Sequence, residues 1–225
     1  MRNEMKESLL MLALASVACS TAQAANVEPS KSAVTRAVHQ YLGEHGDLCV
    51  GKYQWPRVVT SEDQERGSND AIQLPVLERL GLVQSEEIPA SLVAATETTE
   101  SQSQAASAES IRSYSLTAKG RQYFVEKKHS TLGVHGQTVD HSADFCVAHL
   151  TLDKIVKWTP PDEVRGHTQT LVKYTYKIKP ADWMADPEAR KVFPMVDRII
   201  RGAGVLEMNA TLERQDGKWV PVLPG

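Results

Sequence analysis

A strictly alternating segment near the C-terminal end, residues 171–179, constrains the fold most. Apolar side chains alternate with polar ones along it, as Val172, Lys173, Tyr174, Thr175, Tyr176, Lys177, Ile178 and Lys179. Because successive side chains of a strand point to opposite faces, this pattern predicts an antiparallel strand with one buried face. A helix capped by Asp186, with Pro187 at its first position, and a hairpin at Asp216-Gly217 are also predicted. The second half of the chain therefore reads as an antiparallel sheet that carries one helix.

Helices are easier to recognise in the first half of the chain. Apolar residues at helical spacing predict one helix over 31–43 and a second from Asn69 or Asp70 to about residue 80. The stretch between them is polar from 54 to 69, and we expect it to be irregular. A strand over 111–116 and a helix from Thr117 to about Lys127 should follow.

Residues 94–110 form the clearest change in composition. The segment reads AATETTESQSQAASAES and contains no basic residue, no aromatic residue and no apolar side chain larger than alanine. Such a segment cannot bury enough apolar surface to offset the entropy lost on ordering. We predict a disordered loop.

Two segments of the first half, LPVLERLGLV at 74–83 and YSLTAKGR at 114–121, resemble the second half of a winged-helix domain. The resemblance extends over about residues 31–128 and implies a helix, a two-stranded wing and a further helix start. Many winged helices bind DNA. Here the expected recognition helix carries Asp70 and Glu78 against one cation, Arg79, and the wing insertion is acidic, whereas phosphate contacts require several basic residues. We expect no nucleic-acid partner, and a shape used for protein contact or scaffolding.

The N-terminus resembles a secretory signal. An apolar run of about ten residues, 9–18, is too short to span a membrane as a helix, and it is followed by Ala22-Gln23-Ala24. We predict a signal peptide over 1–24, a periplasmic mature chain and no transmembrane segment in that chain. A lipid anchor at Cys19 is the first alternative, although Ser16 stands where a lipoprotein signal usually has leucine. An N-terminal core helix of a cytoplasmic protein is the second.

Removal of residues 1–24 would leave two cysteines in closely similar surroundings, DLCV around Cys49 and DFCV around Cys146. Because cysteines of exported proteins usually pair, we predict a disulfide between them. Two buried free thiols are the alternative, since cysteine also packs as a small apolar residue.

Neither composition nor motifs indicate an enzyme. The net charge of −3 gives no argument for an anionic partner, and the hydrophobic content of 41% is compatible with a packed core. Phosphate-binding loops, G-x-S-x-G and C-x-x-C are absent from the sequence, and Gly202-Ala203-Gly204 follows a helix rather than a strand. We expect no cofactor.

Two weaker signals concern binding. His135, His141 and His149 lie in a polar stretch and could supply nitrogen ligands to zinc or copper, together with Asp140 and Asp144; solvated loop histidines are the alternative. Trp183 precedes the C-terminal helix and is a candidate anchor for a protein partner if exposed, or a core residue if not.

The sequence as a whole predicts an α+β protein. It should consist of a winged-helix-like module over 31–129 joined to an antiparallel module over 130–225. We expect a non-catalytic periplasmic binding protein whose partner is another envelope or secreted protein, in an envelope assembly or an immunity-type role. A metal or small-molecule binder that uses the cleft between the modules is the alternative, and a hydrolase with a discontinuous site is the third hypothesis.

Overall fold

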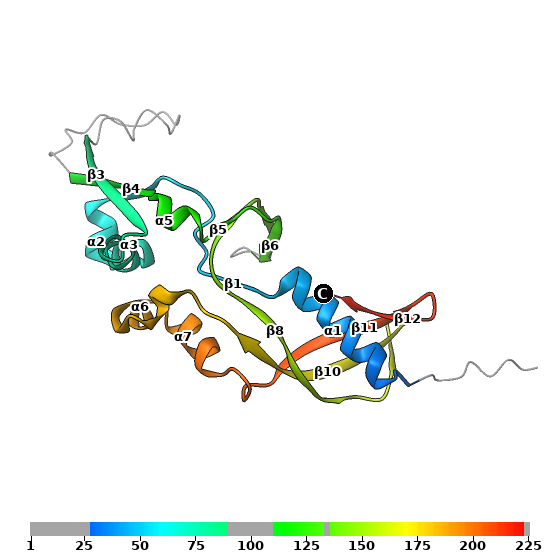
Figure 1. Ribbon diagram of the computed structural model, residues 1–225. Helices are drawn as coiled ribbons and strands as arrows, with labels where there is room; N and C mark the ends of the chain where they lie inside the picture. Colours follow the sequence, from blue (N-terminus) through cyan, green and yellow to red (C-terminus); the bar gives the residue numbers. More distant parts are fainter. Residues whose placement is uncertain (1–27, 90–109, 133–135, 223–225) are drawn as a thin grey trace, which may run out of the picture.

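The computed structural model describes residues 28–89, 110–132 and 136–222. The predicted signal peptide, Cys19 and all but the last residue of the segment 94–110 lie outside the described residues, as does His135. The described chain is α+β, as predicted, with a curled antiparallel sheet as its largest element (Figure 1). No helix among the described residues is long and apolar enough to cross a membrane.

Seven antiparallel strands form this sheet. Its main path runs through β1 (Asp47–Cys49), β8 (Asp144–Trp158), β10 (His167–Ile178), β11 (Met208–Gln215) and β12 (Lys218–Val222). Two short strands join it at the side, β5 (Phe124–Val125) on β8 and β9 (Asp162–Val164) on β10. Val172, Tyr174 and Tyr176 of β10 are all buried, which confirms the prediction from alternation. The predicted hairpin joins β11 and β12, with positive φ at Asp216 and Gly217.

Helix α1 (Lys31–His45) packs on this sheet, against β8, β11 and β12. Its N-terminus is capped by Ser30, whose hydroxyl oxygen accepts from the Ala33 amide at 3.2 Å. The buried face of the helix meets Tyr174, Leu212 and Trp219 in one core and consists of Val34, Ala37, Val38 and Leu42. Helix α1 was expected in the winged-helix-like module over 31–129, but it contributes to the core of the antiparallel module over 130–225.

A three-stranded sheet lies at the other end of the molecule (Figure 1). Its strand order is β2 (Arg57–Val59), β4 (Ser110–Leu116) and β3 (Val83–Pro89), and it packs with α2 (Ser61–Arg66) and α3 (Asn69–Arg79). The prediction of an irregular stretch over 54–69 was wrong, because it contains β2 and α2. Helix α2 buries none of its six residues, so it shows no apolar period, and it is held by a capping box between Thr60 and Asp63.

The helix predicted after Thr117 is shorter than expected. Thr117 does cap α5 (Ala118–Arg121), but the chain turns out of the helix and pairs Phe124 with Phe145 of β8. Pairing with β8 gives hydrogen-bond partners to the backbone N–H and C=O groups of residues 124–125, which a longer helix would have paired internally.

Three short helical segments lie near the C-terminal end: η1 (Asp182–Ala185), α6 (Pro187–Val192) and α7 (Pro194–Arg201). They contribute to a core that we call the first core, and we call the core that contains the buried face of α1 the second core. Asp186 caps α6 as predicted, accepting from the amides of Glu188 and Ala189, and Pro194 divides the expected single helix into two. Helix α6 contacts α3, so residues from both halves of the chain share a core that includes Leu74, Leu77, Phe145, Trp183 and Phe193.

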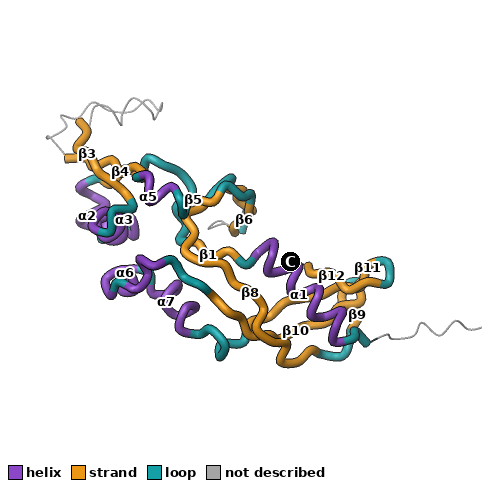
Figure 2. Tube along the Cα trace, viewed as in Figure 1, coloured by secondary structure: helices purple, strands orange, loops and turns teal. Residues whose placement is uncertain are grey.

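Hydrophobic packing therefore crosses the expected division at residues 129 and 130. Strand β8 runs from one core to the other, with Phe145 and Val147 in the first and Leu150 in the second (Figure 2). The two expected wing strands, β3 and β4, do pair antiparallel after α3, but every buried residue of α1 belongs to the second core. The winged-helix likeness of residues 31–128 thus remains a proposal.

Candidate functional site

The connection from β1 to β2, residues 50–56, passes between two cavities. Its path is set by Asp144, whose carboxylate accepts from the amides of Gly51 at 3.2 Å, Lys52 at 2.7 Å and Phe145 at 2.6 Å. Gly51 has a φ of 73°, a conformation that favours glycine. Lys52 lines one cavity and Tyr53, the next residue, lines the other.

We call the cavities around Tyr53 the Tyr53 cleft. It consists of three cavities of about 450, 540 and 470 Å³, each of which is lined in part by Tyr53. The first shares Lys128 and Ser130 with the second, and Gln54 and Ser142 with the third. The clefts of small-molecule sites usually measure about 300–1,000 Å³, so the size suits a ligand.

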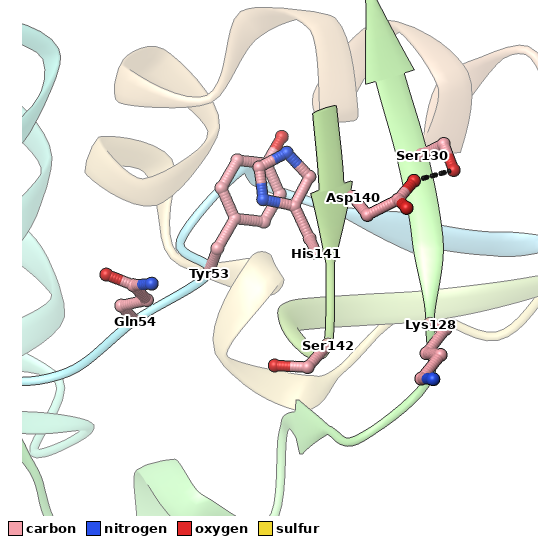
Figure 3. Close-up of a pocket in the computed structure, with 7 residues that line it drawn as sticks. All are labelled: Tyr53, Gln54, Lys128, Ser130, Asp140, His141 and Ser142. Carbon is pink, nitrogen blue, oxygen red and sulfur yellow. Dashed lines mark hydrogen bonds between the residues drawn. The ribbon is translucent and has the colours of Figure 1, made fainter. Parts of the chain in front are cut away.

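One wall of the cleft is the hairpin of β6 (His129–Leu132) and β7 (Thr138–His141), which forms a two-stranded sheet of its own. The imidazole of His141 stacks on the ring of Tyr53, with centroids 3.5 Å apart and planes 15° from parallel (Figure 3). Thr131 Oγ1 and His141 Nε2 are 2.9 Å apart, and the Ser130 hydroxyl donates to Asp140 at 2.5 Å. Burial, together with the charge of Asp144, raises the pKa of the Tyr53 hydroxyl.

The disulfide also lines the cleft. The predicted bridge between Cys49 and Cys146 is present, and the two residues are directly opposite each other on β1 and β8. Beside it, Asp47 accepts from Lys127 Nζ at 2.6 Å and lies 2.8 Å from His149 Nδ1. Burial alone would raise the pKa of Asp47, but the bonds to Lys127 and His149 outweigh it and lower the pKa.

The predicted metal ligands are not gathered into a site within the described residues. His141 is in the hairpin wall of the cleft, whereas His149 is bonded to Asp47, and His135 lies outside the described ranges. Residues 28–89, 110–132 and 136–222 hold no group of three or more His, Cys, Asp or Glu side chains that could bind a metal. The set of three histidines is untested, because one of its members is not described.

Trp183 is a correction to the sequence analysis. The side chain was a candidate for an exposed partner anchor, but it is 5% exposed. Its ring lies among those of Tyr123, Phe145 and Phe193, with centroids 5.9–6.2 Å apart. The reason is that η1 turns the residue inward, beneath α6, so it stabilises the core and presents no surface to a partner.

Several cleft residues gave no signal in the sequence. Tyr53 follows a short strand in a stretch without a motif, and Thr131 and Lys128 lie far from it along the chain. Asp140, His141 and Asp144 were selected as metal ligands and Cys49 and Cys146 as a disulfide, and none of them was selected for a place in this cleft. Gly51-Lys52-Tyr53, a glycine followed by a polar–aromatic pair shortly after Cys49, is the local feature of the sequence that marks this turn.

Fold and cleft together define a disulfide-bridged α+β protein with two cores and a cleft of ligand size. Comparison with known proteins adds no relationship to this description: no family model, no curated protein and no solved structure matches the chain.

Proposed function

We propose that this protein is a non-catalytic binding protein, exported to the periplasm, and that the Tyr53 cleft holds its ligand. The observation that carries the proposal is the convergence of three cavities on one stacked pair, Tyr53 and His141. The disulfide and the signal-like N-terminus support export.

The lining of the cleft favours an amphipathic ligand. In the 540 Å³ cavity of the cleft, apolar surface comes from Leu48, Val125 and the disulfide. Lys128 and Ser130 supply polar groups where this cavity meets the 450 Å³ cavity. Sites for small ligands combine these two kinds of lining. The ligand is either a small organic molecule or a single side chain presented by another envelope or secreted protein, because both fit the volume.

Native mass spectrometry of the protein taken from a periplasmic fraction without reductant tests this proposal. We expect a chain that starts at Ala25 and carries a co-purifying small molecule or protein. Tyr53→Ala should release that ligand, while circular dichroism stays unchanged. His167→Ala is the matched control for His141→Ala, since His167 lies on β10 and does not line the cleft. A ligand that persists in both Tyr53→Ala and His141→Ala would place binding elsewhere.

A metal ion is the second candidate ligand, on one specific observation. The register of the hairpin places His129 directly across from His141 on β6 and β7. Titration with Zn²⁺ or Cu²⁺ should then give saturable binding that the joint replacement of His129 and His141 abolishes. Binding unchanged in that variant would remove the metal hypothesis.

A further inference from the structure

The cavity on the other side of residues 50–56 contains a buried lysine. It measures about 450 Å³ and is lined by Lys52, Arg57, Asp70 and Gln73, among other residues. The Lys52 side chain is 4% exposed. Its ammonium donates to Asp70 Oδ1 at 2.5 Å and to Gln73 Oε1 at 2.7 Å. A lysine this deeply buried at the wall of a cavity is unusual, because burial of a charge is costly.

A second cation shares the same carboxylate. Arg57 donates from Nε at 2.6 Å to Asp70 Oδ2, and its Nη2 lies 2.5 Å from the same oxygen. A guanidinium has five N–H donors, and Nη1 of Arg57 has no partner among the described residues. With 26% of its side chain exposed, Arg57 keeps donors for an oxyanion that enters the cavity.

The nearby carboxylates are otherwise engaged. Asp63 also lines the cavity, but it belongs to the capping box with Thr60 and pairs with Arg66 at 3.1 Å. Asp144 accepts from three backbone amides. Within residues 28–89, 110–132 and 136–222, Asp70 is thus the carboxylate that contacts both Lys52 and Arg57.

The environment of Lys52 also shifts the pKa of its ammonium group. Burial, with a smaller contribution from the charge of Arg57, outweighs the effect of Asp70 and lowers the pKa of the Lys52 ammonium. Desolvation and an adjacent cation both favour the neutral amine, which is the nucleophilic form of a lysine.

We propose that Lys52 is a covalent binding site for a small 2-oxo acid, with Asp70 as the counter-ion and Arg57 as the group that holds the carboxylate of the acid. The nitrogen of Lys52 forms a bond to the carbonyl carbon, the C–O bond breaks, and the oxygen leaves as water with two of the three ammonium hydrogens. The product is a protonated Schiff base. Its positive charge replaces that of the ammonium, so the ion pair with Asp70 is retained. This site is separate from the Tyr53 cleft and does not depend on the function proposed there.

Reductive trapping tests this assignment. The intact protein is incubated with glyoxylate and cyanoborohydride at neutral pH, and the modified lysines are located by peptide mass spectrometry. We expect Lys52 to be modified before Lys191, whose side chain is 77% exposed and serves as an internal reference. Modification of Lys191 but not of Lys52 in the folded protein would overturn the proposal and leave the cluster as a structural ion pair.

A variant tests the role of Arg57. Arg57→Gln should slow trapping of glyoxylate by about tenfold, the effect of one lost charge-assisted hydrogen bond. Trapping of acetaldehyde, which has no carboxylate, should slow less in the same variant, because it reports only the loss of the Arg57 charge beside Lys52. Circular dichroism establishes that the variant is folded, and Arg66→Gln on α2 is the matched control. Equal slowing for both carbonyl compounds would refute recognition of the 2-oxo acid.

Discussion

Removal of the disulfide should cost this protein a large part of its stability. The bridge joins Cys49 to Cys146 across a separation of 97 residues. In the chain-entropy model the bond restricts the unfolded chain, and a loop of this length corresponds to about 4.7 kcal/mol at 25 °C. In a domain of this size each kcal/mol moves the melting temperature by about 2–4 °C, so the expected decrease is roughly 9–19 °C.

The folded state should change little on removal of the bond. Strands β1 and β8 are paired by their backbones before the bridge, and beyond it the Val50 amide donates to the Phe145 carbonyl oxygen at 3.0 Å. The Asp144 carboxylate holds the connection that follows Cys49. A Cys49→Ala/Cys146→Ala double variant should therefore keep the native circular dichroism spectrum. The loss of stability should arise in the unfolded state, which becomes more expanded.

Urea unfolding of the oxidised protein and of the double variant measures both effects. We expect a lower midpoint together with a larger denaturant slope for the variant, because the slope increases with the surface exposed on unfolding. Wild-type protein in dithiothreitol is the control and should match the variant. Free energies of unfolding that agree within about 1 kcal/mol would refute the reasoning from loop length.

Three further predictions follow from single positions. Trp183→Ala should lower the free energy of unfolding by about 3–5 kcal/mol, as expected for a buried aromatic residue; a stability close to wild type in urea would contradict its place in the core. Gly120→Ala should lower the free energy of unfolding by about 1–3 kcal/mol, because an added Cβ would lie 1.9 Å from the Leu82 carbonyl oxygen. An unchanged melting temperature would exclude this close approach. Hydrogen bonds from Arg79 and the first amides of α6 lower the pKa of Asp186 from 3.8 to about 2, so the stabilisation it contributes is complete above pH 3.8 and is lost as the pH falls towards 2. Asp186→Asn should flatten the dependence of the urea midpoint on pH in that window, and parallel curves for variant and wild type would refute the assignment.

Local patterns in the sequence determined individual elements of this protein. Alternation at Val172, Tyr174 and Tyr176 defined β10, and Asp186 and Asp216-Gly217 placed a helix start and a hairpin. These features are readable because periodicity, capping and turn geometry act over only a few residues. The pairing of Cys49 with Cys146 was predicted from their compartment and similar surroundings.

The candidate site was less accessible to prediction. His141 was selected as a metal ligand, whereas Tyr53 and Lys52 were not selected at all, and the buried Trp183 was a candidate for an exposed position. Lys52 and Tyr53 acquire their roles from Asp144, which fixes the connection between β1 and β2 from a distant strand. No local pattern encodes such a contact.

The sequence by itself therefore determined α1, α3, β10 and the capped start of α6, but not β2 or α2, and not the end of α5. Only the tertiary structure decided that α1 covers the C-terminal sheet, that α6 packs on α3, and that Tyr53 stacks on His141. The physical reason is that an apolar face specifies burial without specifying its partner. The partner is chosen by how all such faces pack together.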